Sequence, residues 1–149
     1  MYSKILFLDF DGVLHSRTPK SSGEMFRGLS LLEKCLQELP DVGIVITSSW
    51  RSHPKDLEHA YSKFPTGIRD RVLGETPVFG DRKEREREIL DWMATHRVSS
   101  NDVVILDDEA DLFSNLNNRL VTVNGLFGIR EKDLKRLASL IQSKLKPAN

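Results

Sequence analysis

Short apolar segments recur along the chain, and polar residues follow each of them. Val, Ile and Leu dominate these segments and do not alternate with polar residues. This pattern is typical of strands in a parallel sheet that helices cover on both faces. Four such strands are predicted, over residues 5–10, 42–47, 103–106 and 120–123.

Helical periodicity fills the intervals between these strands. Apolar residues three or four positions apart mark the buried face of a helix. Pro40 ends the first predicted helix, whereas Pro54 suits the first turn of a weaker helix over residues 54–64. The three apolar stripes are Leu29, Leu32, Leu36 and Leu39; Ile89, Leu90 and Met93; and Leu134, Leu137, Ile141 and Leu145, before a polar tail at 146–149.

Strands that alternate with helices predict one doubly wound, Rossmann-like α/β domain with a mainly parallel sheet. The 149 residues suffice for a single domain over 1–149 with a sizeable core, and no repeat or linker divides them. Sheets of this class bind ligands at the carboxyl ends of their strands. The polar residues after each strand are therefore the first candidates for a site, with the polar segment 16–28 as a loop over it.

Composition narrows the choice of partner and compartment. Lys plus Arg and Asp plus Glu number 22 each, so the net charge is zero and any nucleic-acid role must rest on a local patch. The single Cys35 excludes an internal disulfide, and its place in the first apolar stripe favours a small core residue. No apolar run approaches the roughly 18 residues of a membrane span. We therefore expect a soluble, cytoplasmic protein with no membrane partner.

Paired carboxylates follow two of the predicted strands. Asp9 and Asp11 are two positions apart and point to the same side of a strand, where their repulsion is costly unless a cation lies between them. Gly12 then lets the backbone turn sharply. Asp107 and Asp108 follow the third strand and add the hard oxygen ligands that Mg²⁺ prefers. The alternative is that these residues cap turns and helices.

Two further segments offer groups for an anionic ligand. The second strand ends at Thr47 and Ser48, whose hydroxyls and neighbouring N–H groups suit phosphate oxygens, although a helix N-cap explains them equally well. Residues 81–88 form a mixed charge run, which is usually a solvated helical face. One basic residue of this run is expected to turn inward and offset the acids.

These segments resemble the four motifs of the haloacid dehalogenase superfamily. The resemblance lies in Asp9-Phe10-Asp11-Gly12-Val13, the hydroxyl that closes the second strand, a basic residue before the third strand, and Leu106-Asp107-Asp108-Glu109-Ala110-Asp111. The motifs occur in the family's order over residues 4–111. The segment Thr47-Ser48-Ser49-Trp50-Arg51 is most similar to small capless domains, some of them attached to RNA-repair proteins.

The resemblance implies a two-step phosphoryl transfer. Asp9 would attack phosphorus and form an aspartyl-phosphate, and Asp11 would protonate the leaving oxygen and later take a proton from water. Because dehalogenases lack this second acid, a phosphatase is favoured. Thr47, or less plausibly Ser48, would bind the phosphoryl group. Lys83 is the preferred cation, with Arg85 and Arg82 as alternatives.

The same resemblance implies a Mg²⁺ cofactor. Asp108 is the preferred direct ligand, with Asp107 sharing the role or supporting it, and Asp9 and the backbone carbonyl of Asp11 complete the set. Further contacts to substrate are expected from Gly12, Ser48, Arg51 and Arg85.

The intervals between the motifs leave no room for a cap domain. Residues 13–28 can form a loop or hairpin, and residues 48–81 a helix and a loop, so we expect an open site. An open site favours a macromolecular phosphorylated substrate such as a phosphoprotein or a nucleic-acid end. Scattered surface charge is the alternative for the basic residues near such a mouth, and His15 is expected to be structural. The mouth candidates are Arg17, Lys20, Arg27, Arg51, His53 and Trp50.

Three functions follow from the sequence. The first is a Mg²⁺-dependent phosphatase, and the second is a phosphatase that acts on 3′- or 5′-phosphorylated nucleic-acid ends. The third is a non-catalytic module that binds phosphate and Mg²⁺ without turnover.

Overall fold

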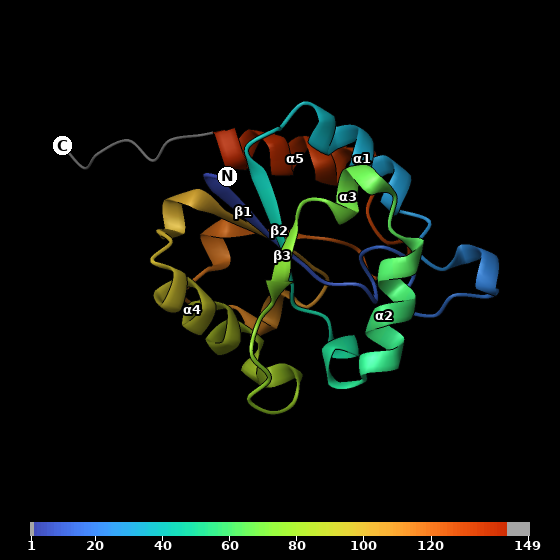
Figure 1. Cartoon of the computed structure of the whole chain (residues 1–149), viewed down its shortest axis with the longest axis horizontal. Helices are drawn as coiled ribbons and strands as arrows, with labels where there is room; N and C mark the ends of the chain where they lie inside the picture. Colours follow the sequence, from blue (N-terminus) through green and yellow to red (C-terminus); the bar gives the residue numbers. More distant parts are fainter. Residues whose placement is uncertain (1, 143–149) are drawn as a thin grey trace.

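A computed structural model describes residues 2–142 and shows a single α/β domain built on five parallel strands in the order β3-β2-β1-β4-β5 (Figure 1). Four of the strands are those predicted from the apolar segments, and they differ from the prediction by one or two residues at their ends. The strands are β1 (Lys4–Leu8), β2 (Val42–Ile46), β3 (Val72–Glu75), β4 (Val103–Asp107) and β5 (Leu120–Thr122).

Helices cover both faces of this sheet. Residues from α1, α2, α3 and α5 join one apolar cluster with Leu6 and Leu8 of β1, whereas α4 packs on the other face against Phe7. Figure 1 shows α1 and α5 side by side, with α4 across the sheet from them. The helices are α1 (Leu29–Gln37), α2 (Pro54–Lys63), α3 (Thr66–Arg69), α4 (Arg85–His96) and α5 (Glu131–Gln142).

Strand register aligns the polar residues that follow the central strands. Leu8 of β1 pairs with Ile46 of β2 and with Leu106 of β4. The next residue of each strand segment is Asp9, Thr47 or Asp107, so these three continue one row across the carboxyl edge of the sheet. Because side chains alternate along a strand, this row faces the same side as Phe7, which is the side of α4.

The segment between β2 and α4 contains two elements that the sequence did not predict. Residues 48–81 contain α2 as expected, but also the short helix α3 and the edge strand β3. β3 lacks the continuous apolar run of a buried strand, because only one face of it is covered. Leu73 is 51% exposed, and Gly74 interrupts the apolar residues. Neither this segment nor residues 13–28 forms a cap, as predicted.

The remaining expectations concern loops and ends. Residues 16–28 form a loop that contains one 3₁₀ turn, η1 (Ser22–Glu24). Cys35 lies partly buried on α1, where its thiol faces the carbonyl of Leu134 on α5. Within residues 2–142, no helix combines the length and apolar character needed to cross a membrane. The predicted helix residue Leu145 and the tail 146–149 lie outside the described residues.

Candidate active site

Three carboxylates converge at the carboxyl edge of the sheet. Asp9 after β1, Asp107 at the end of β4 and Asp108 beside it bring oxygen atoms within 4.8 Å of one another. Asp9 is 4% exposed and Asp107 is fully buried, so their mutual repulsion is weakly screened by water. Such a set of hard oxygen donors suits Mg²⁺, which would also neutralise the repulsion.

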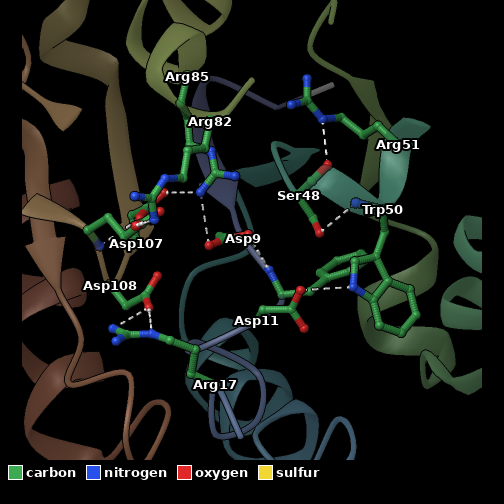
Figure 2. Close-up of polar contacts among 12 residues, drawn as sticks. Asp9, Asp11, Arg17, Ser48, Trp50, Arg51, Arg82, Arg85, Asp107 and Asp108 are labelled. Atoms are coloured by element: carbon green, nitrogen blue, oxygen red, sulfur yellow. Dashed lines mark hydrogen bonds and ion pairs between the residues drawn. The ribbon is translucent and has the colours of Figure 1, made fainter. Parts of the chain in front are cut away.

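A buried cation already lies against two of these acids. Arg85, the first residue of α4, donates from Nη1 to Oδ2 of Asp9 at 3.1 Å and to Oδ2 of Asp107 at 3.0 Å (Figure 2). Burial alone lowers the pKa of Arg85, but the charges of Asp9 and Asp107 outweigh this and raise it above its usual value. The guanidinium is therefore permanently charged and holds the two carboxylates together.

The structure thus brings a different cation to the site from the one preferred on sequence. Lys83 is exposed on the 3₁₀ turn η3 (Arg82–Glu84) and does not line the cavity around the acids. Arg82 is exposed as well and pairs with Glu109. Because α4 begins only at Arg85, the turn before it keeps Lys83 away from the acids and leaves Arg82 at the rim of their cavity, whereas Arg85 points inward.

Burial dominates the electrostatics of the acids. It raises the pKa of Asp9 to about 8; Arg85 opposes this rise, and Asp107 and Asp108 reinforce it. The pKa of Asp107 is also raised by burial, against the effects of Arg85 and the backbone N–H of Glu109. Arg85 therefore does not compensate for both Asp9 and Asp107, and the third carboxylate, Asp108, has the exposed Arg17 as its partner. The cluster accordingly favours either a proton or a further cation.

Glycines make room for Asp108. A Cβ at Gly12 would lie 2.2 Å from Oδ2 of Asp108, and a Cβ at Gly125 would lie 2.6 Å from the same atom. Gly12 also has φ +79°, so both the close approach of Asp108 and the left-handed backbone require glycine at this position. Arg17 fills the remaining side of this slot, with Nη2 2.7 Å from Oδ2 of Asp108.

Asp11 lies beside the cluster with its own partners. Its Oδ1 is 2.8 Å from Nε2 of His15, and its Oδ2 accepts a hydrogen bond from Nε1 of Trp50 at 3.0 Å. The hydrogen bond with His15 contributes most to lowering the pKa of Asp11. The Asp11 side chain is 45% exposed and lines the same cavity as Asp9, within reach of a bound ligand.

The two hydroxyls after β2 have different surroundings. Ser48 accepts a hydrogen bond from the backbone N–H of Trp50 at 3.2 Å, and so acts as the N-cap of η2 (Ser49–Ser52). Thr47 is fully buried next to Asp9, and its Oγ1 has no hydrogen-bond partner among residues 2–142. An unpaired buried hydroxyl is costly, which makes Thr47 the better candidate to bind a ligand oxygen.

Arg51, which we predicted to contact substrate, is committed to protein partners. It donates to Glu88 of α4 at 3.0 Å and to Oγ1 of Thr76 at 2.6 Å, and its side chain is only 6% exposed. Because Glu88 is itself almost fully buried, it requires this cation. We therefore expect Arg51 to tie η2 to α4 rather than to bind substrate.

A cavity of about 410 Å³ lies over the acids and is lined by Asp9, Asp11, Arg17, Arg85 and Asp108 among others. A second cavity of about 410 Å³ adjoins it and extends to Trp50 and His53; the two share Ser49, Asp81, Arg82 and Arg85. Of the predicted mouth residues, Lys20 and Arg27 are exposed but line neither cavity.

Sequence reasoning missed two contributions to this site. Gly125 approaches Asp108 from the loop after β5, a contact with no local signal because more than a dozen residues separate the two. The contacts of His15 and Trp50 with Asp11 were also missed. The spacing of four between Asp11 and His15 was the available signal, since the residues after Gly12 turn back toward the acid.

Comparison with known proteins identifies the family of the chain. No curated protein matches the chain. The family model for the HAD domain in Swiss Army Knife RNA repair proteins matches residues 5–134, a span that includes every acid, hydroxyl and cation of the cavity described above. The protein is therefore a member of the haloacid dehalogenase superfamily, in the family of HAD domains found in Swiss Army Knife RNA repair proteins.

Proposed function

We propose that this HAD-type domain is a Mg²⁺-dependent phosphatase that hydrolyses a phosphomonoester through an aspartyl-phosphate on Asp9. The convergence of Asp9, Asp107 and Asp108 within 4.8 Å is the observation that carries the proposal. The unpaired hydroxyl of Thr47 and the charge of Arg85 support it, because both adjoin Asp9 and suit a phosphoryl group.

Mg²⁺ fits the acids that remain available. Both oxygens of Asp107 have protein donors, namely Arg85 and the backbone N–H of Glu109 at 2.9 Å. Among the described residues, Asp108 has only the exposed Arg17 as its partner, so Asp108 is the preferred direct ligand. Asp9 has donors on both oxygens, the backbone N–H of Phe10 and Arg85. Unlike Asp107, it faces the same cavity as Asp108, and it therefore joins Asp108 as a ligand. The ion would offset their charge and polarise the phosphoryl oxygens.

In the first step, an Asp9 oxygen forms a bond to phosphorus while the bond to the leaving oxygen breaks. Asp11 donates its proton to that oxygen. In the second step, water attacks phosphorus, loses a proton to Asp11 and releases inorganic phosphate and Asp9. The negative charge of a bound phosphoryl group favours the protonated form of Asp11 that the first step needs.

The test is hydrolysis of an aryl phosphate with Mg²⁺ by the wild type and by Asp9→Asn. We expect turnover by the wild type and none by the variant. Asp91→Asn, on the exposed face of α4, is the matched control and keeps full activity. Activity that survives in Asp9→Asn contradicts the proposed nucleophile. Wild type that binds beryllium fluoride with Mg²⁺ but turns over no phosphate would be a binding module instead.

A nucleic-acid end is the second candidate substrate. The family description favours it, and so does the adjoining cavity, where Trp50 and the exposed His53 offer ring surfaces beside the acids. Turnover of 3′- and 5′-phosphorylated oligonucleotides should then exceed that of mononucleotides and phosphopeptides. Equal turnover of all four classes would leave only the general phosphatase.

A further inference from the structure

The carboxyl group of Asp11 lies between two ring N–H donors, one on each oxygen (Figure 2 draws the contact with Trp50). We infer that His15 and Trp50 are positioning residues, which orient Asp11 for proton transfer to the leaving oxygen. The inference rests on the proposed phosphatase function. It assigns a catalytic consequence to a histidine that the sequence suggested to be structural.

The ring of His15 has a defined tautomer. Its Nδ1 accepts a hydrogen bond from the backbone N–H of Phe26 at 3.2 Å, so this nitrogen carries no proton. The proton of the neutral ring is then on Nε2, which donates to Oδ1 of Asp11 at 2.8 Å. The His15 side chain is fully buried, so water does not compete for either nitrogen.

The backbone at Phe26, which donates the hydrogen bond to His15, has an unusual conformation. Phe26 has φ +59°, a left-handed conformation that is unfavourable for a residue with a Cβ. The strained residue directs its N–H at His15, and the two rings are nearly perpendicular with centroids 5.1 Å apart. Strain of this kind persists where the surrounding structure over-determines it, and it clusters at functional sites.

Trp50 is fixed in a similar way. Its indole meets the rings of Phe26 and Phe10 edge-on, with centroid distances of 5.3 and 5.7 Å. Its backbone N–H is held by Ser48. Because an indole Nε1 can only donate, its hydrogen bond fixes the orientation of Oδ2 of Asp11.

Together the two donors fix the plane of the Asp11 carboxyl group at the edge of the cavity. Both are rings with few rotatable bonds, and both are held by other parts of the protein. The carboxyl group therefore needs little reorganisation when a phosphate ester binds next to Asp9. A mispositioned Asp11 would protonate a leaving oxygen poorly but would leave nucleophilic attack by Asp9 intact.

Leaving-group dependence of kcat/KM tests this assignment, because kcat/KM covers only the steps through departure of the leaving group. An alkyl phosphate needs a proton on its leaving oxygen, whereas 4-nitrophenyl phosphate does not. For His15→Phe and Trp50→Phe we expect kcat/KM to fall about tenfold or more for the alkyl ester and less than about threefold for the aryl ester. His15→Gln keeps an N–H donor and should restore much of the loss.

A double-mutant cycle separates positioning from general damage. In an Asp11→Asn background, His15→Phe should not change the alkyl-to-aryl ratio further, because its target is already disabled. Equal loss on both esters in the single variants, or a further change of the ratio in Asp11→Asn, overturns the inference while the wild-type activity still supports the phosphatase. Wild type inactive on both esters removes the proposed function itself, and the inference with it.

A spectroscopic measurement adds a readout that does not depend on turnover. Long-range ¹H–¹⁵N spectra of the full chain should show His15 as a neutral ring with the proton on Nε2. A proton on Nδ1 would contradict the hydrogen bond from Phe26, and with it the inferred orientation of Asp11.

Discussion

Arg85 reaches Asp9 across the face of the sheet, with its Nη1 3.1 Å from Oδ2 of the acid. The contact joins the first residue of α4 to the residue after β1, which are 76 positions apart in the chain. It distinguishes one buried cation in the charge run 81–88 from the other basic residues of that run, Arg82, Lys83 and Arg87, which are exposed. Several consequences for stability and metal binding can be measured.

Loss of the Arg85 guanidinium should destabilise the fold. Arg85→Gln leaves Asp9 and Asp107 buried without their cation, and above about pH 8, where Asp9 is ionised, removal of one partner of a buried ion pair typically costs about 3–5 kcal/mol. Urea unfolding in EDTA measures this loss, and Mg²⁺ should recover part of it. Lys83→Gln, in the exposed turn before α4, should change the free energy of unfolding by less than about 0.5 kcal/mol. Equal effects of the two substitutions would contradict the position of Arg85.

The raised pKa of Asp9 predicts an unusual dependence of stability on pH. The unfolded chain releases this proton near pH 3.8, whereas the metal-free folded protein keeps it up to about pH 8. Because the folded state binds the extra proton in this window, the free energy of unfolding should fall as pH rises from about 4 to 8. Urea titrations in EDTA at several pH values measure this slope.

Two changes should flatten that slope. Asp9→Asn removes the titrating group, and Mg²⁺ stabilises the ionised carboxylates, so its stabilising effect should be larger at high pH. A metal-free protein whose stability is constant, or rises, over the same range would contradict the raised pKa.

Gly12→Ala should disturb Asp108 directly. The added Cβ would meet Oδ2 of Asp108 at 2.2 Å, and φ +79° is unfavourable for alanine by about 1–2 kcal/mol. We therefore expect both lower stability and a weaker affinity for Mg²⁺, measured by calorimetry. Gly23→Ala is the matched control, because its nearest atom lies 3.7 Å away in an exposed loop. Unchanged Mg²⁺ affinity in Gly12→Ala would argue against Asp108 as a ligand.

Removal of Arg17 should instead strengthen Mg²⁺ binding. Arg17 pairs with Asp108 through Nε and Nη2, and a divalent ion has to compete with it for the same carboxylate. The Arg17 side chain of this pair is 53% exposed, although that of Asp108 is buried. An ion pair whose cation is exposed to water is worth about 1 kcal/mol or less, so the Kd for Mg²⁺ should fall up to about fivefold in Arg17→Ala. Arg27→Ala removes a charge from the same loop without touching Asp108 and should leave the Kd nearly unchanged. Weaker binding in Arg17→Ala would contradict the competition.

The sequence contained most of the fold because its signals are local. Buried parallel strands are continuous apolar runs, so β1, β2, β4 and β5 could be read directly, and register then brings Asp9 and Asp107 together. The edge strand β3 could not be predicted in this way, because half of it faces solvent and its pairing with β2 shifts register near Gly74.

The choice of cation shows what local patterns lack. Lys83 and Arg85 have similar charge and flanking residues, and only the phase at which η3 gives way to α4 decides which one points inward. That phase is set by packing of α4 on Phe7, a long-range contact. The glycine contact at Gly125 depends on tertiary structure in the same way.

Substitutions of Thr47 and Ser48 should have opposite effects on stability, and the Thr47 substitution should have the larger effect on activity. Thr47→Val keeps the shape but removes a buried hydroxyl with no partner among residues 2–142, so the fold should gain about 1 kcal/mol while kcat/KM for phosphate esters falls. Ser48→Ala removes the N-cap of η2, so it should cost about 1 kcal/mol of stability with a smaller effect on turnover. Urea unfolding and aryl phosphate kinetics on both variants measure the contrast. If Ser48→Ala abolishes turnover and Thr47→Val does not, the phosphoryl group is bound by Ser48, and the unpaired hydroxyl of Thr47 has no part in catalysis.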